Sequence, residues 1–342
     1  AYFYFQPELI LTPRRFLLVH LAITTIGIAL WYAAVQYFLP RIWQRQLYLH
    51  SSLYKLNLNT EIQKFLAEHN TLGWQFSGQF NPRYIKAYDR TTVLLPIIWQ
   101  TANDELTDLF HYKHLGVEFL DLNRFYELTQ RTIPLSGLSE LWFLHSVSYS
   151  SHQLFDLAKR LMDIFAGLLG TTITVALWPF IGLAIKVNSS GPIYFKQERV
   201  GQQGQIFTLY KFRSMSGGVT NTWTEAGDTR ITSVGKWLRR LRLDELPQFY
   251  NILKGNMSLV GPRPEQVNIV AELNTQIPYY DERHMVKPGL TGWSQLHVYA
   301  NDLDSTKQKL QYDLYYIKNR GLLLDIEIVL RTAFYIMTLQ GK

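Results

Sequence analysis

The chain has 342 residues, and 47% of them are hydrophobic. That fraction excludes a disordered chain, and the length allows two or three domains. A formal net charge of +7 favours anionic partners: nucleic acid, acidic lipid headgroups or phosphorylated substrates. There is no cysteine, which excludes disulfides and thiolate metal sites.

The first strong feature is an apolar stretch over residues 16–39, which holds no Lys, Arg, Asp or Glu. A membrane-spanning helix needs about 20 predominantly apolar residues, so this stretch is long enough. Basic residues lie on both sides of it, so the positive-inside rule gives no orientation. The alternative is a buried helix of a soluble domain. We expect residues 1–45 to form an N-terminal segment with a transmembrane helix at 16–39.

Residues 46–150 alternate between short strand and helix patterns. The expected strands are 47–49, 73–80, 92–98 and 117–122, and the expected helices are 60–69 and 104–112. This alternation is typical of a small α/β domain. No G-x-G-x-x-G motif follows the first strand, so the sequence does not support a dinucleotide site. We therefore expect a structural or regulatory role for this domain.

A second apolar stretch, residues 164–185, also lacks charged side chains but contains Pro179. Proline removes one helical hydrogen bond and clashes with the preceding turn. The pattern therefore allows either a kinked span or a re-entrant hairpin of two short helices. Thr172 and Thr174 are candidate partners for the freed carbonyl.

The last apolar stretch, residues 321–339, is amphipathic and contains Asp325, Glu327 and Arg331. These charges interrupt it too often for a span. We expect a helix that either lies at the membrane interface or packs in a core.

The most informative segment for chemistry surrounds Asp244 and Glu245. Three arginines precede this acidic pair: Arg239, Arg240 and Arg242. Pro247 suits the first turn of a helix, so the carboxylates are expected at or just before a helix N-terminus. The helix dipole and free backbone N–H groups favour anions there.

Such a pair has two interpretations. It can be a surface ion-pair cluster, which is the common outcome for an arbitrary Asp-Glu dipeptide. Alternatively, the carboxylates bind Mg²⁺ beside an anionic substrate while arginines hold its phosphates, and one carboxylate attacks phosphorus to form a covalent intermediate.

Further cations lie in short motifs around this segment. Arg263 stands between Pro262 and Pro264, which restrict the backbone and fix the direction of the guanidinium. Three more candidate phosphate-binding cations are Arg199, Lys211 and Arg213. Taken singly, each of these motifs is also compatible with a solvated strand or turn. Residues 287–293 form a glycine-rich turn that lacks the G-K-[ST] ending of a P-loop.

Six motifs occur in order: SSGPIYFKQERVG, LYKFRSM, GDTRIT, LDELPQFYNILKGNMSLVGPRPE, VKPGLTGWSQ and YDLYYIKN. With them the chain resembles the bacterial sugar transferases, also called polyprenyl-phosphate hexose-1-phosphate transferases or monotopic phosphoglycosyl transferases. The resemblance covers about residues 156–339. Residues 116–144 also resemble the end of the N-terminal region in long members of this family.

The resemblance implies a fold. It predicts an α/β membrane protein with an N-terminal transmembrane helix and a small, degenerate Rossmann-like α/β domain over 46–150. A mostly helical catalytic domain over 151–342 follows, with a re-entrant membrane helix at 160–186 that is broken near Pro179. The active site is expected to face the cytoplasm at a bacterial inner membrane.

The resemblance also implies a reaction. Asp244 is expected to attack the β-phosphate of a UDP-sugar, releasing UMP, before polyprenyl (undecaprenyl) phosphate takes the sugar-phosphate. Glu245, with Asp244, is expected to bind Mg²⁺, and Arg239 to hold phosphate. Lys159 and Arg160 match basic residues suited to the lipid phosphate. This would be the first membrane step of exopolysaccharide or other glycoconjugate synthesis.

Two positions depart from the family pattern. Trp178 replaces a serine before the proline, and Tyr299 replaces an arginine on the substrate side. The second departure favours an alternative function, a catalytically inactive scaffold of polysaccharide assembly, whereas the intact acidic pair opposes it. We expect membrane lipids as partners, allow for a homodimer, and expect no nucleic acid.

Overall fold

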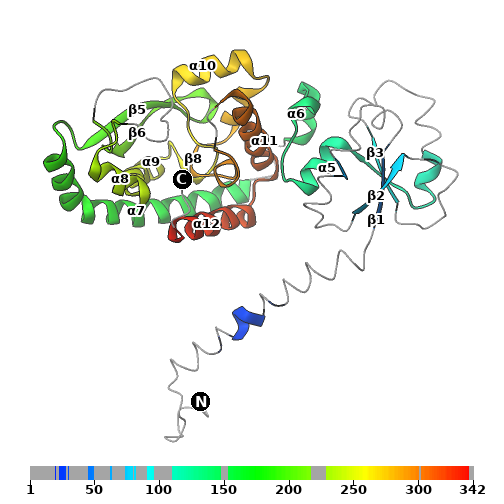
Figure 1. Ribbon diagram of the computed structural model, residues 1–342, viewed down its shortest axis with the longest axis horizontal. Coiled ribbons are helices and arrows are strands. Elements are labelled where there is room, and N and C mark those ends of the chain that lie inside the picture. The colour runs from blue at the N-terminus through cyan, green and yellow to red at the C-terminus, as the bar shows by residue number, and fades with distance from the viewer. Residues whose placement is uncertain are drawn as a thin grey trace, which may run out of the picture. The chain divides into compact units, whose positions relative to one another are not determined.

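The computed structural model describes residues 110–147, 153–216, 229–299 and 302–338. Before residue 110 it describes 20, 23–27, 30, 45–49, 62–63, 74–79, 81 and 91–95. The chain forms two compact units, residues 1–130 and 131–342 (Figure 1). The expected span at 16–39 lies largely outside the described residues, although 20, 23–27 and 30 are helical.

The first unit contains a four-stranded parallel sheet in the order β2-β1-β3-β4. Its strands are β1 (Arg45–Leu49), β2 (Trp74–Gln79), β3 (Thr91–Leu95) and β4 (Glu118–Asp121). These strands confirm the predicted α/β class. The order is compatible with an open doubly wound sheet, but most segments between the strands lie outside the described residues. A Rossmann-like domain therefore stays a prediction.

Helix α5 (Leu122–Thr129) follows β4 directly because Asp121 caps it, accepting a hydrogen bond from the backbone N–H of Arg124 at 2.8 Å. Its buried Phe125 stacks on Trp74 of β2, with ring centroids 5.3 Å apart. Together with Leu47, Leu49 and Leu94, these rings form the core of the first unit.

The second unit begins earlier than the boundary that the sequence suggests at residue 150. Ile133, and Phe143 of α6 (Glu140–Ser146), belong to the main hydrophobic core of the second unit. That core also contains residues of α10 (Val267–Gln276), α11 (Leu303–Asn319) and α12 (Leu322–Met337). Burial of these apolar side chains assigns residues 131–147 to the second unit.

Two small sheets position the loops of the second unit. Strands β5 (Tyr194–Val200) and β6 (Ile206–Phe212) form an antiparallel hairpin. Strands β7 (Ser258–Val260) and β8 (Gly289–Thr291) pair in parallel and hold the Gly-Pro-Arg-Pro and Lys-Pro-Gly motifs side by side. Gly261 is required at this point, because a Cβ there would lie 2.4 Å from the carbonyl oxygen of Lys287.

The long helix α7 (Gln153–Asn188) packs along the second unit (Figure 1). It lies so close to α9 (Gln248–Lys254) that a Cβ at Gly170 would be only 2.2 Å from the Phe249 ring. Farther along, Ile181 and Ile185 share a core cluster with residues of β6 and α8 (Ser233–Arg240).

The opposite face of α7 is apolar and exposed over its whole length. It includes Leu154 (86% exposed), Phe165 (71%), Phe180 (74%) and Val187 (81%). Residues Leu154–Asn188 are long and apolar enough to cross a membrane. A continuous apolar face of this size is typical of a membrane contact.

The break predicted near Pro179 does not interrupt the helix, since α7 continues through it to Asn188. Packing of the turns after Pro179 on the second unit offsets the loss of one backbone hydrogen bond. The hydroxyls of Thr172 and Thr174 do not donate to the carbonyl that Pro179 leaves without its helical donor. They donate instead to the carbonyls of Leu168 and Gly170. The re-entrant course of α7 through a membrane stays a prediction.

Helix α12 has features of both alternatives that the sequence left open, a helix packed in a core and a helix at a membrane interface. Leu324, Asp325 and Ile328 are buried against the second unit. The other side of the helix is exposed and apolar, with Leu323 at 85% and Met337 at 74%. The helix therefore packs on the core with one face and leaves the other available to an apolar surface.

A buried ion pair ties α7 to α12. The Lys159 amine donates to Asp325 Oδ2 at 2.6 Å, and Asp325 is fully buried. Lys159 also donates to the carbonyl of Val260 in β7. Tyr316 lies within hydrogen-bonding distance of both Lys159 and Asp325.

We expect Lys159→Met to lower the free energy of unfolding by about 3 kcal/mol, because it leaves Asp325 buried without its cation. That is the low end for a broken buried pair, since burial already raises the pKa of Asp325 and the carboxyl can take up a proton. The double variant Lys159→Met/Asp325→Leu should recover much of the loss. The measurement is thermal unfolding in detergent, and a single variant as stable as the parent would contradict this role.

Candidate active site

The acidic pair lies in a short 3-10 turn, Leu243–Glu245, between α8 and α9. Arg242 begins this turn with a left-handed backbone (φ 56°), which is uncommon outside glycine. The Thr174 hydroxyl of α7 lies 3.1 Å from the carbonyl oxygen of Leu246, so the turn is positioned by α7. The prediction that the carboxylates come just before a helix is confirmed.

Glu245 is surrounded by cations. Its Oε1 accepts hydrogen bonds from Arg263 at 2.8 Å and from Lys211 at 3.1 Å, and its Oε2 lies 3.6 Å from Arg242. Burial alone would raise the pKa of Glu245, but the charges of Arg263, Lys211 and Arg242 outweigh burial and hold that pKa well below its ordinary value. Glu245 is therefore a fixed, ionised carboxylate.

Asp244 has the opposite environment. Its side chain is 8% exposed, and within the described parts of the chain it has no hydrogen-bond donor and no cation within ion-pair distance. Burial raises the pKa of Asp244, and the neighbouring charge of Glu245 raises it further. The nearby charges of Lys211, Arg239 and Arg263 partly oppose this effect. Asp244 thus lies near cations, but its own carboxylate oxygens make no hydrogen bond or ion pair with the described residues.

Arg263 is held in place by a buried network behind it. Arg283, which is 2% exposed, donates to the backbone carbonyl of Arg263 at 3.0 Å and to Asp313 Oδ2 at 2.8 Å. The other oxygen of Asp313 accepts a hydrogen bond from Ser294 at 2.6 Å. The network fixes the backbone from which Arg263 reaches Glu245, so its members position the site without contacting the acidic pair.

Local sequence patterns did not predict this network. Arg283, Asp313 and Ser294 lie in segments that give no local sign of burial or partnership. Asp313 lies in the motif YDLYYIKN and Ser294 in the motif VKPGLTGWSQ, and their presence in these motifs is the one sequence signal that points to them.

Arg199 supports the same loop from β5. It donates to the carbonyl of Pro264 at 2.9 Å and lies 3.6 Å from Glu265. Glu265 also accepts a short hydrogen bond from Lys309 of α11. Burial lowers the pKa of Arg199 to about 10, although Glu265 opposes this shift. The Arg199 guanidinium, which we expected to bind phosphate, thus contacts a backbone carbonyl, a carboxylate and the side-chain amide of Gln197.

The remaining predicted cations divide into two groups. Lys211 and Arg263 contact Glu245, and the charge of Arg239 acts on Asp244, so these three belong to the site. Arg213 does not, because it donates to the carbonyl and hydroxyl of Ser189 at the end of α7.

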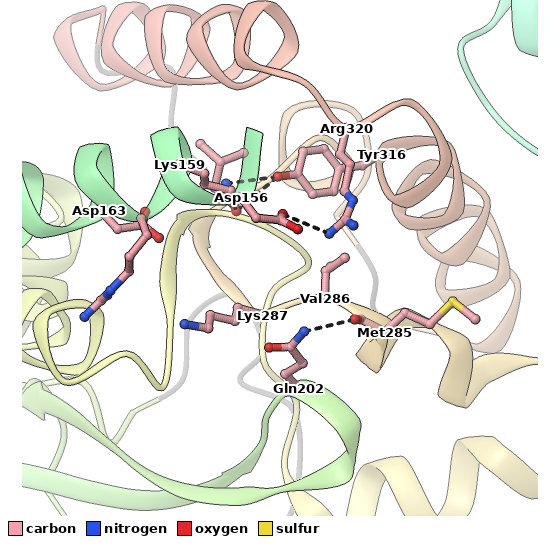
Figure 2. Close-up of a pocket in the computed structure, with 11 residues that line it drawn as sticks. Asp156, Lys159, Asp163, Gln202, Met285, Val286, Lys287, Tyr316 and Arg320 are labelled. Carbon is pink, nitrogen blue, oxygen red and sulfur yellow. Dashed lines mark hydrogen bonds and ion pairs between the residues drawn. The ribbon is translucent and has the colours of Figure 1, made fainter. Parts of the chain in front are cut away.

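Lys159 and Arg160, predicted to hold a lipid phosphate, make internal contacts. Lys159 pairs with Asp325, and Figure 2 shows its link to Tyr316. Arg160 donates to the carbonyls of Ile252 and Leu253 at 2.9 and 2.8 Å, where α9 ends. A cation at this position donates hydrogen bonds to the free carbonyls at the end of the helix and interacts favourably with the helix dipole.

The carboxylates of the site suit a hard divalent cation in one respect. Mg²⁺ is commonly held by one or two carboxylates together with substrate phosphates and water. In the residues that the structure describes, no cluster of three or more His, Cys, Asp or Glu side chains could hold a metal ion. Asp244 and Glu245 could therefore supply at most a partial coordination shell.

Comparison with known proteins connects this site to a family. The family model for bacterial sugar transferases matches residues 154–339. A UDP-N-acetylgalactosamine-undecaprenyl-phosphate N-acetylgalactosaminephosphotransferase of Aeromonas hydrophila is 42% identical over 220 residues, which are 62% of this chain and 52% of that protein.

Two further relatives differ in length. A UDP-glucose:undecaprenyl-phosphate glucose-1-phosphate transferase of Escherichia coli K12 is 35% identical over 67% of this chain and 47% of its own. An exopolysaccharide production protein, PSS, of Rhizobium leguminosarum is 36% identical over 54% of this chain and 96% of its own.

The chain spans about half the length of the first two relatives, and the matched region contains the whole acidic-pair site. The family model covers more than half of the chain. The chain therefore belongs to the bacterial sugar transferase family.

Proposed function

We propose that this chain transfers a sugar-1-phosphate from a UDP-sugar to undecaprenyl phosphate through a covalent intermediate on Asp244, releasing UMP. The observation that carries the proposal is the contrast between two adjacent carboxylates. Glu245 is fixed and ionised by three cations, whereas Asp244 lies near two of them, Lys211 and Arg263, with its oxygens uncommitted. One carboxylate is thus available to react while the other maintains the site.

In the first step an Asp244 oxygen bonds to the β-phosphorus of the donor. The bond from that phosphorus to the bridging oxygen breaks, and the bridging oxygen leaves with UMP. In the second step a phosphate oxygen of undecaprenyl phosphate bonds to the same phosphorus. The bond to Asp244 then breaks, which restores the carboxylate and leaves a lipid-linked diphosphate sugar.

Three cations of the site suit the charge of this reaction. Arg263 and Lys211 face Glu245, and the charge of Arg239 acts on Asp244. Their charges favour the ionised form of Asp244, which is the nucleophilic form. The same charges would stabilise the negative oxygens of a diphosphate placed beside Asp244.

We also propose that Asp244 and Glu245 hold Mg²⁺ with the donor phosphates. Their oxygen ligands fit this ion, and a substrate diphosphate would complete its coordination. When bound, the ion would neutralise part of the charge of the diphosphate.

Two apolar faces support a position of the site at a membrane. The exposed sides of α7 and α12 belong to the same unit as the acidic pair. We propose that these faces contact the cytoplasmic leaflet of a bacterial inner membrane, where a lipid phosphate can reach Asp244. The transferred sugar is left open, since the names of the relatives specify different sugars.

Purified protein in lipid nanodiscs with Mg²⁺ and undecaprenyl phosphate should release UMP from at least one of a panel of UDP-sugars. Asp244→Asn should lower the rate by a factor on the order of 10³ or more, because it removes the nucleophile. Glu245→Gln should also lower it severely, since three cations lose their carboxylate.

Asp304→Asn provides a matched control, because Asp304 is an exposed carboxylate of α11 whose one ion pair among the described residues is with Lys307 at the surface. It should keep the parent rate. Near-normal turnover by Asp244→Asn would exclude Asp244 as the nucleophile. Failure of every donor with folded protein would favour the inactive scaffold.

The absence of cysteine allows a direct test of membrane orientation. We expect His145→Cys, before α7, and Ser190→Cys, after it, to react with an impermeant thiol reagent from the cytoplasmic side only. The reason is that α7 packs along one unit and keeps both of its ends with it. Labelling of the two positions from opposite sides would show that α7 crosses the membrane.

A further inference from the structure

A cavity of about 290 Å³ lies beneath the first turns of α7 (Figure 2), and neither Asp244 nor Glu245 lines it. Its walls come from α7, from the end of α11, from the turn after β5 and from the loop that leads to β8. Four cations and two carboxylates line it: Lys159, Arg160, Lys287, Arg320, Asp156 and Asp163. The lining thus carries an excess of positive charge.

Most of these charges already have partners in the protein. Lys159 pairs with Asp325, Arg160 donates to two carbonyls of α9, and Arg320 lies 3.5 Å from Asp156. Asp163 accepts hydrogen bonds from the hydroxyl of Ser258 and the N–H of Leu259.

Lys287 differs from the other three cations. Its side chain extends beneath α7 into the space that Figure 2 shows. Within the described residues, its amine has no hydrogen bond and no ion pair. Burial lowers the pKa of Lys287, and the nearby charge of Arg160 lowers it further. An anion in the cavity would therefore meet one uncommitted cation in a positive environment.

The position of the cavity indicates what kind of anion it takes. The same turns of α7 that form its roof carry Leu154, Leu157 and Leu161 on their outer side, at 86%, 60% and 61% exposure. A lipid phosphate lies at this kind of boundary between charged and apolar surface. The one aromatic ring in the lining, Tyr316, is 1% exposed, so no ring face is available to stack on a base.

The cavity and the acidic pair lie at opposite ends of α9. Arg160 contacts the carbonyls where α9 ends, and Glu245 lies three residues before Gln248, where α9 begins. Seven helical residues span about 10 Å. Neither Asp244 nor Glu245 lines the cavity, so a phosphate bound beside Lys287 is held by other side chains than those of the acidic pair.

We propose that this cavity binds the phosphate group of a membrane lipid through Lys287, as a site separate from Asp244 and Glu245. The ligand class is a lipid with a terminal phosphate or an anionic phosphate headgroup. The proposal does not depend on the transfer reaction, because it concerns binding in the absence of any donor.

The test is calorimetric titration of the full chain in nonionic detergent, without nucleotide sugar, using dioctanoyl phosphatidic acid. We expect saturable binding that Lys287→Gln weakens about tenfold or more, the effect of losing one charged hydrogen bond. Lys307→Gln, which removes the same charge from an exposed pair with Asp304, should leave binding unchanged.

Two further arms make the test decisive. Gln202→Glu places a negative charge on another wall of the cavity and should weaken binding in the same way, so the test stands if Lys287→Gln does not fold. Inorganic phosphate should bind at least about tenfold more weakly than the lipid phosphate. Equal affinity for inorganic phosphate would overturn the lipid assignment, and unchanged lipid binding in both cavity variants would overturn the site.

Discussion

The bonds from Arg263 and Lys211 to Glu245 are the interaction on which the rest of the site depends. They hold one carboxylate ionised in a buried position, and they bring two cations beside Asp244. Without a permanent negative charge at Glu245, these cations would have to be desolvated without a partner. The cluster thus allows the proposed nucleophile and the proposed phosphate-binding cations to occupy one small volume.

Two longer-range supports keep this cluster in place. Behind it, Arg283 and Asp313 fix the backbone of Arg263 and connect it to α11. In front of it, Thr174 of α7 contacts the carbonyl that follows Glu245. Helix α7, which carries the apolar outer face, therefore also contacts the turn that holds the acidic pair. This arrangement explains how a charged cluster can lie close to a surface suited to lipid.

Local sequence rules predicted much of this arrangement. The strands of the first unit, the helix after Pro247 and the position of Asp244 before it follow from patterns within a few residues. The roles of Lys159, Arg160, Arg199 and Arg213 could not be predicted, because their partners are distant in the chain. Arg160, for example, bonds carbonyls 92 and 93 residues away. A basic residue in a motif does not reveal whether it meets a substrate or a backbone carbonyl.

The most direct test of the account is the mass of the intact protein after incubation with a UDP-sugar donor and Mg²⁺ in the absence of lipid acceptor. A covalent step on Asp244 predicts a gain equal to one sugar-phosphate, located on Asp244 by peptide mapping and removed when undecaprenyl phosphate is added. UMP release that requires both substrates, with no adduct on the protein, would contradict it.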